Sequence, residues 1–263
     1  MAEQLLALEQ HLRELRDRGR KLLVPYVTGG LGDDWTEVVR AYAAAGADAI
    51  EVGIPFSDPV MDGPTIQQAS EAALAQGTTA GSILNDLRAV DAGVPLVVMT
   101  YVNLVFHTGW QRFAAEAVAS GVSGVILPDL PMEELSEWEP AAEDAGLATV
   151  QLASPLTPDG RLSALCARSQ GFVYGVNLLG VTGEREDLAD SSAVLAKRLK
   201  AVTDLPVIMG FGIATVDHAR AATVHADGVV VASALMRMRL DGASPDDLGS
   251  EVARLRAGLD DSR

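Results

Sequence analysis

An acidic residue inside an apolar segment is the first feature that needs a chemical explanation. Glu51 lies within the run Asp48-Ala-Ile-Glu51-Val-Gly53, whose composition predicts a buried strand. Removing an unpaired, ionised carboxylate from water costs several kcal/mol, so this position needs either a buried ion pair or a function. Glu51 is therefore predicted to be a catalytic acid or base, with a structural salt bridge as the alternative.

Other polar candidates follow or interrupt apolar runs. Asp58 and Asp62 lie in the segment after the first run, Asp129 stands between two prolines, and Tyr174 lies inside a later run. Two carboxylates in one site can divide general acid and general base work when their surroundings separate their pKa values. Asp62 also precedes Pro64, so it could simply cap a helix. Asp129 is predicted to be a turn or supporting residue.

Three glycine- or serine-bearing segments indicate phosphate binding. Residues 180–183 read Gly-Val-Thr-Gly, residues 210–215 read Gly-Phe-Gly-Ile-Ala-Thr, and residues 232–237 read Ala-Ser-Ala-Leu-Met-Arg. Backbone N–H groups of such loops and of helix N-termini bind phosphate. Ser233 is predicted to cap a short helix. Together the three segments predict a phosphorylated substrate.

These residues need a scaffold that brings strand ends together. Eight apolar runs alternate with segments of helical spacing, and the runs lack the apolar/polar alternation of half-exposed strands. This pattern predicts an α/β protein, a (β/α)8 TIM barrel, with a doubly wound open sheet as the rival. The predicted strands are residues 22–28, 48–53, 96–101, 124–129, 148–154, 171–177, 206–212 and 228–233.

Two additions to the barrel are predicted. The segment 1–21 has leucines interleaved with charges, which indicates an extra amphipathic N-terminal helix and not a signal peptide. The stretch from Gly53 to Leu96 is the longest gap between strands and must hold a long loop and two helices, predicted at 64–74 and 80–90. Long loops after barrel strands usually carry function.

Composition narrows the class of protein. A chain of 263 residues is predicted to form one domain, 1–263. Its net charge of -16 disfavours binding to nucleic acid or to anionic membranes. No stretch has the ~20 apolar residues of a membrane span, and a cytoplasmic location is expected. The single cysteine, Cys166, is predicted to be a buried thiol, and the four histidines show no ligand spacing, so no metal site is expected.

The residues then match a known pattern along nearly the whole chain. The stretch Asp48-Ala-Ile-Glu51-Val-Gly-Ile-Pro55-Phe-Ser-Asp58-Pro-Val-Met-Asp62-Gly-Pro-Thr65-Ile-Gln67 resembles the signature of the tryptophan synthase α subunit family. Supporting matches are Pro25-Tyr-Val-Thr28, Tyr101-Val-Asn103, Pro128-Asp129-Leu-Pro131, Gly180-Val-Thr-Gly183 and Gly210-Phe-Gly212-Ile213.

The resemblance implies retro-aldol cleavage of indole-3-glycerol phosphate to indole and glyceraldehyde 3-phosphate, with no metal or organic cofactor. It implies that Glu51 shuttles a proton between indole C3 and the glycerol hydroxyl, that Asp62 holds the indole N–H, and that Tyr174 orients the reacting end. Tyr26 and Tyr101 would contact the indole. The substrate's phosphate end would lie against Thr182, Gly183, Phe211, Gly212, Ala232 and Ser233.

Three positions depart from the family pattern near the phosphate. Ala232 stands where a glycine is usual, Asn177 begins a loop where many members have serine, and Glu184 follows Gly183 where a small residue is usual. A methyl group or a carboxylate near phosphate disfavours close approach.

The family also implies a partner, a pyridoxal-phosphate-dependent tryptophan synthase β subunit in an α2β2 complex. A stand-alone lyase that releases free indole is one alternative. A mainly allosteric partner of a β subunit is another, and a phosphosugar isomerase is the remaining enzymatic alternative.

Overall fold

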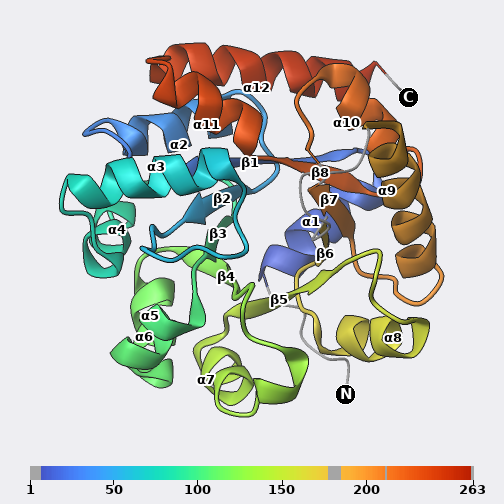
Figure 1. Cartoon of the computed structure of the whole chain (residues 1–263), viewed down its shortest axis with the longest axis horizontal. Coiled ribbons are helices and arrows are strands. Elements are labelled where there is room, and N and C mark those ends of the chain that lie inside the picture. The colour runs from blue at the N-terminus through green and yellow to red at the C-terminus, as the bar shows by residue number, and fades with distance from the viewer. Residues whose placement is uncertain (1–6, 177–184, 211, 262–263) are drawn as a thin grey trace.

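Eight parallel strands form a closed barrel in which each strand pairs with the next and β8 pairs with β1 (Figure 1). The computed structural model describes residues 7–176, 185–210 and 212–261. Every predicted strand is present, which confirms the (β/α)8 TIM barrel and excludes the open sheet. The strands are β1 (Leu22–Thr28), β2 (Ile50–Gly53), β3 (Leu96–Met99), β4 (Val122–Ile126), β5 (Ala148–Ala153), β6 (Val173–Val176), β7 (Val207–Gly210) and β8 (Gly228–Val231).

Helices surround the barrel, and the long gap after β2 holds a loop and two of them, as predicted (Figure 1). The segment after β4 holds a 3-10 turn followed by a short α-helix. The elements are α1 (Ala7–Asp17), α2 (Trp35–Ala44), α3 (Pro64–Ala75), α4 (Ala80–Leu87), α5 (Val102–Thr108), α6 (Trp110–Ala119), η1 (Met132–Glu134), α7 (Trp138–Ala145), α8 (Asp159–Arg168), α9 (Arg185–Lys200), α10 (Val216–Thr223), α11 (Ser233–Leu240) and α12 (Pro245–Asp260).

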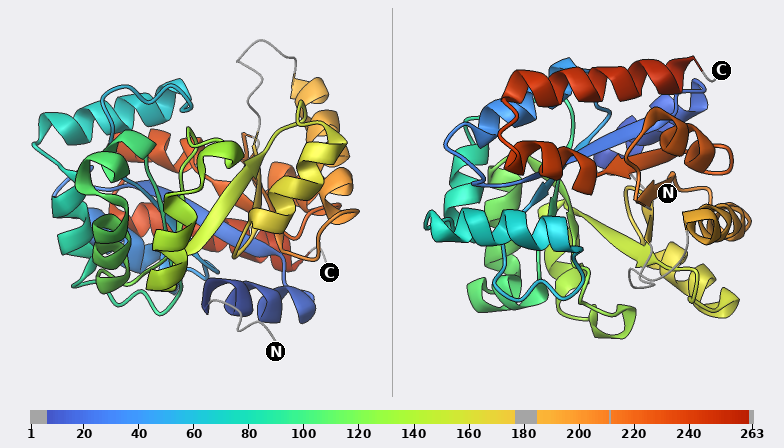
Figure 2. Two further views of the ribbon diagram at one scale, coloured as in Figure 1. Left: turned by 90° about the horizontal axis from the view of Figure 1, so that it is seen from below. Right: turned by 45° about the horizontal axis from the view of Figure 1, so that its top comes forward.

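The extra N-terminal helix closes the end of the barrel where the strands begin. Leu8 and Leu12 of α1 are fully buried among inward-facing residues of the strands. Gly124 and Gly171 make room for this contact, because a Cβ at either position would lie 2.7 Å from Leu8 Cδ2. The left view of Figure 2 shows α1 at one end of the barrel. With this end filled, access to the barrel interior is from the opposite end, where the strands finish.

A buried ion-pair cluster fastens the same end. Asp48 is buried, and its carboxylate accepts from Arg20 Nε at 2.5 Å, from Arg256 at 3.1 Å and from the Leu23 backbone N–H at 2.8 Å. Because all of these partners satisfy one carboxylate, the cluster joins β1, β2 and α12 without leaving a buried charge unpaired. Asp48 therefore has a structural role, in contrast to Glu51 three residues later.

Cys166 lies buried in α8 with its thiol free, as predicted. Within the described ranges, no helix combines the length and apolar character needed to cross a bilayer.

Candidate active site

Glu51 points into the barrel from β2, toward the open end. It is paired in register with Tyr26 of β1 and with Val97 of β3. Side chains alternate along a strand, and Ala49, two residues before Glu51, packs in the interior cluster, so Glu51 faces the same way. Tyr174 of β6 also belongs to that cluster. The exposed fractions are 2% for Glu51, 2% for Tyr26 and 7% for Tyr174. The barrel thus brings these three predicted residues together.

The surroundings of Glu51 favour its protonated form. Burial raises the pKa of its carboxyl group to about 8, and the nearby charge of Asp62 adds to the rise, while a hydrogen bond with the Tyr174 hydroxyl opposes it. No cation pairs with Glu51 among the described residues, which removes the salt-bridge alternative. Its Oε2 atom is buried and has no hydrogen-bond partner in the part of the chain that the structure describes. Such an orphan is unusual in native proteins and calls for an explanation.

Asp62 is held over the barrel mouth by Tyr101. The Tyr101 hydroxyl donates to Asp62 Oδ2 at 3.0 Å and accepts from the Met61 backbone N–H at 3.0 Å. Phe56 stacks on the Tyr101 ring with centroids 4.9 Å apart. Burial raises the pKa of Asp62 to about 6, partly offset by the bond from Tyr101. The helix-cap alternative is wrong, because the N-cap of α3 is Gly63 and not Asp62, and no side-chain cap hydrogen bond is made there.

Two tyrosines lie over glycines of the neighbouring strand. A Cβ at Gly53 would lie 1.8 Å from the Tyr26 hydroxyl oxygen, and a Cβ at Gly210 would lie 2.7 Å from the Tyr174 hydroxyl oxygen. Each glycine is two residues beyond the register partner of its tyrosine, since Tyr26 pairs with Glu51 and Tyr174 with Ile208. Both rings therefore lean toward the mouth, and the two glycines are needed to accommodate them.

The predicted phosphate end is described in part. Thr182, Gly183 and Phe211 lie outside the described residues, as do Asn177 and Glu184. Gly212 follows β7 with a φ of 57° and open space around it.

Ala232 is the N-cap of α11, and Ser233 is the first residue of that helix. The prediction that Ser233 caps α11 is therefore wrong, because the chain enters the helix one residue earlier and the N-cap alanine has no side-chain acceptor. Ala232 therefore supplies no side-chain cap to the first N–H groups of this helix.

Comparisons with known proteins agree with this geometry. The family model described as "Tryptophan synthase alpha chain" matches residues 12–257. The chain belongs to the tryptophan synthase alpha chain family. The alpha chain of Thermobifida fusca is 42% identical over 265 residues, covering 97% of this chain and 98% of its own length. That of Xanthomonas oryzae pv. oryzae is 44% identical over 255 residues, covering 94% and 93%.

Solved structures give the same result. A structure of Mycobacterium tuberculosis tryptophan synthase has a TM-score of 0.90 at 37% identity and covers 97% of this chain and 99% of the matched chain. Tryptophan synthase subunit alpha from Legionella pneumophila has a TM-score of 0.88 at 31% identity, with 98% and 100% covered. The family resemblance inferred from residues 48–67 is thereby confirmed.

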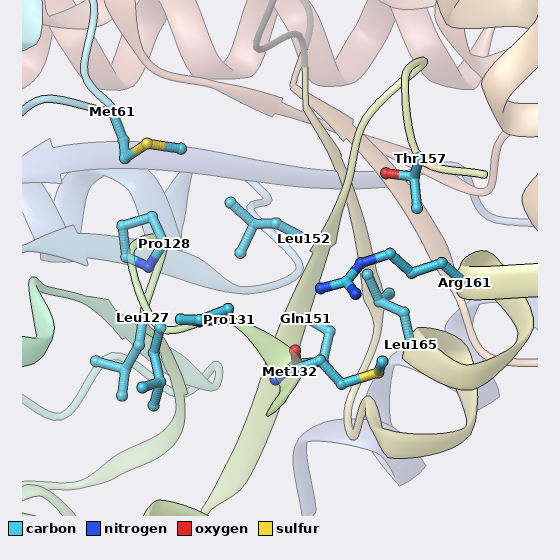
Figure 3. A pocket seen from close by; sticks show the side chains of 11 residues that line it. Met61, Leu127, Pro128, Pro131, Met132, Gln151, Leu152, Thr157, Arg161 and Leu165 are labelled. Atoms are coloured by element: carbon cyan, nitrogen blue, oxygen red, sulfur yellow. The ribbon is translucent and has the colours of Figure 1, made fainter. Parts of the chain in front are cut away.

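Beside the mouth of this alpha-chain barrel lies a pocket of about 200 Å³ (Figure 3). Met61, the neighbour of Asp62, lies on one side, Leu127 and Leu152 contribute apolar surface, and Arg161 reaches in from α8. Sequence reasoning missed these apolar residues, because a leucine at a strand end has the same signature as a core leucine. The proximity of Met61 to Asp62 in the sequence is the one signal that could have located this pocket.

The remaining acidic candidates, Asp129 and Asp58, make local hydrogen bonds. Asp129 Oδ1 accepts from the Val102 backbone N–H at 2.9 Å, at the start of α5, as its predicted supporting role requires. Asp58 is exposed and accepts from the Ser57 hydroxyl at 2.6 Å. In the described parts of the chain, no three His, Cys, Asp or Glu side chains gather in a way that could hold a metal ion.

Proposed function

We propose that this chain is a tryptophan synthase α subunit that cleaves indole-3-glycerol phosphate to indole and glyceraldehyde 3-phosphate. The observation that carries this proposal is the pair of carboxylates at the barrel mouth. With a pKa of about 8, Glu51 holds its proton at neutral pH, and with a pKa of about 6, Asp62 is ionised. When the surroundings of two carboxyl groups separate their pKa values, the group with the higher pKa can act as the acid and the other as the base or charge stabiliser.

The reaction then uses the two groups in order. Protonated Glu51 gives its proton to C3 of the indole, and the carboxylate of Asp62 stabilises the positive charge that develops at the ring N–H. The Glu51 carboxylate next takes the proton of the glycerol hydroxyl. The C–C bond breaks, its electron pair returns to the indole ring, and the hydroxyl carbon becomes the aldehyde. Glu51 ends protonated, as it began.

The site supports one orientation of the substrate. The aromatic rings of Tyr26, beside Glu51, and of Tyr101, beside Asp62, offer surface for the indole ring. The loops after β7 and β8, with Gly212 and the start of α11 at Ser233, offer backbone N–H groups for the phosphate. Glu51 on β2 and Tyr174 on β6 would then flank the glycerol carbon that reacts.

A partner subunit fits the surface around the mouth. Val60, Phe106 and Leu156 are large exposed apolar residues in segments that follow β2, β3 and β5. Exposed apolar residues grouped at one end of a protein indicate an interaction surface. We infer that this end binds a tryptophan synthase β subunit, which receives the indole. The stand-alone lyase is less well supported because these residues would then stay exposed. The carboxylate pair disfavours a purely allosteric partner.

The test is to incubate the purified chain with indole-3-glycerol phosphate, alone and with a tryptophan synthase β subunit. Indole and glyceraldehyde 3-phosphate should appear in equal amounts, faster when the β subunit is present, and the two proteins should co-elute from a size-exclusion column. Absence of both products in the presence of the β subunit would refute the proposed reaction. Full activity without co-elution would support the stand-alone lyase instead.

A further inference from the structure

The hydroxyl group of Tyr26 accepts a hydrogen bond from a neighbouring residue, but its own proton has no acceptor among the described residues. Thr28, two residues further along β1, donates its hydroxyl proton to the Tyr26 oxygen at 3.3 Å. A phenol can accept one hydrogen bond and still donate its own proton. Among the residues that the structure describes, no acceptor receives the Tyr26 proton. Because the side chain is 2% exposed, bulk water does not readily take that place.

The absence of a side chain at Gly53 shows where the Tyr26 hydroxyl group lies. The Tyr26 oxygen occupies the volume that a side chain at residue 53 would fill, since a Cβ there would lie 1.8 Å from it. Residues 51 and 53 face the same side of β2, about 7 Å apart along the strand. The Tyr26 hydroxyl therefore stands between Glu51 and the mouth, on the path that a substrate takes to reach Glu51.

Glu51, on the neighbouring strand, has a carboxyl oxygen that lacks a hydrogen-bond partner among the described residues. Its Oε2 atom is buried and receives no hydrogen bond from any described residue, although Tyr26 is its register partner on the adjacent strand. Tyr26 and Glu51 are register partners and interact electrostatically, so once Glu51 has given up its proton, an unpaired donor and an unpaired acceptor lie on neighbouring strands. A hydroxyl group placed between them would satisfy both, because it can accept from Tyr26 and donate to Glu51.

We propose that Tyr26 is a further catalytic residue of this reaction, whose hydroxyl donates a hydrogen bond to the glycerol hydroxyl oxygen that Glu51 deprotonates. The inference rests on the proposed function, which places that hydroxyl at Glu51. When Glu51 takes the proton, the O–H bond breaks, the C–C pair leaves toward the ring, and the oxygen becomes the aldehyde carbonyl. Tyr26 keeps its own proton and stabilises the negative charge that builds on this oxygen.

The electrostatic surroundings of Tyr26 keep its hydroxyl group protonated, as a hydrogen-bond donor must be. Burial, together with the charges of Asp62 and Glu51, raises the pKa of Tyr26 well above its usual value. The phenol consequently stays protonated throughout the pH range in which Glu51 and Asp62 titrate. A phenylalanine ring would line the site equally well, so the proposed catalytic role belongs to the hydroxyl group of Tyr26.

Tyr26→Phe isolates that group, because it keeps the ring and removes only the oxygen. With indole-3-glycerol phosphate and the β subunit, kcat should fall about 10- to 100-fold, while KM rises no more than about 5-fold. Thr28→Val, which removes the donor that orients Tyr26, should lower kcat in the same direction by a smaller factor. Tyr42→Phe is the matched control, because Tyr42 is also buried and its hydroxyl has no partner within the described ranges, yet it lies in α2 outside the barrel.

A binding measurement separates the hydroxyl contact from the packing of the ring. In a Glu51→Gln background, which does not turn over, Tyr26→Phe should weaken indole-3-glycerol phosphate binding by about 5-fold. It should not affect binding of indole-3-propyl phosphate, which lacks the reacting hydroxyl. Unchanged kcat in Tyr26→Phe, or equal weakening of both ligands, would overturn the inference. If the wild-type protein produced indole in either case, the proposed function would stand while this inference fell.

Discussion

Tyr101 Oη lies 3.0 Å from Asp62 Oδ2, so a side chain from the end of β3 fixes a carboxylate in the loop after β2. The same oxygen accepts from the Met61 N–H, which orients the phenol proton toward Asp62. A hydrogen bond to the charged form of a carboxyl group lowers its pKa. Tyr101 thereby keeps Asp62 ionised in surroundings whose burial opposes ionisation.

Removing this bond should shift the pH dependence of cleavage. The wild-type profile of kcat/KM should be bell-shaped, with its acidic limb near the Asp62 pKa of about 6 and its alkaline limb near the Glu51 pKa of about 8. In Tyr101→Phe the acidic limb should move to higher pH, because Asp62 loses the donor that favours its charged form. The rate should be measured from pH 5 to pH 9 in both proteins. An acidic limb that stays in place would show that Asp62 does not set it.

Folding stability should also depend on pH through Glu51. A carboxyl group ordinarily titrates near pH 4.5, whereas in the folded chain the pKa of Glu51 is about 8. Between these values the folded state binds more protons than the unfolded state, so the free energy of unfolding falls as pH rises. Urea denaturation at pH 6 and pH 8 should show a larger loss for the wild type than for Glu51→Gln. Equal losses would mean that Glu51 is not protonated in the folded protein.

The apolar surface at the mouth should carry part of the β-subunit affinity. Phe106 is 68% exposed and contacts Trp110 with ring centroids 5.9 Å apart. Phe106→Ala should weaken binding at least about 10-fold, since truncation of a central aromatic residue in an interface costs ~2 kcal/mol, with little change in the melting temperature of the isolated chain.

Val224→Ala is the control, because Val224 is equally exposed at the end of α10, where the chain turns back to the start of β8. If both variants bound the β subunit as the wild type does, the partner surface would have to lie elsewhere.

The alanine at the start of α11 gives a separate test of the phosphate end. If the N–H groups at Ala232 and Ser233 face the phosphate, the Cβ of Ala232 restricts close approach, and Ala232→Gly should lower KM with kcat nearly unchanged. The alternative is that Ala232, which packs against the core cluster, serves stability. In that case glycine would cost ~0.5 to 1 kcal/mol of stability. Steady-state kinetics beside a thermal melt distinguishes these, and an unchanged KM with a lower Tm would place the phosphate elsewhere.

The sequence allowed the barrel and one catalytic candidate to be predicted for the same physical reason. Strands buried on both faces are continuous apolar runs, and a carboxylate within such a run, as at Glu51, stands out against them. Asp62 could not be separated from a helix cap, because its spacing before Pro64 fits both roles. Only the long-range contact with Tyr101 decides between them.

Other parts of the site depend on pairings between strands that a linear pattern does not contain. The contact of Tyr26 with Gly53 follows from the register of β1 against β2, and the apolar pocket follows from the loops that meet beside Leu127 and Leu152. The predicted helix cap at Ser233 was one residue too late, because β8 ends and α11 begins without a turn signal in the sequence between them.

The most direct test of the account is the rate of indole release by Glu51→Gln in the presence of a β subunit. Glutamine keeps the size of the side chain but cannot transfer a proton, so indole formation should fall by at least about 10²- to 10⁴-fold. Equilibrium binding of indole-3-glycerol phosphate and the melting temperature should stay close to those of the wild type. Indole release at a near-normal rate would contradict the assignment of Glu51 as the proton shuttle, and with it the mechanism derived from this site.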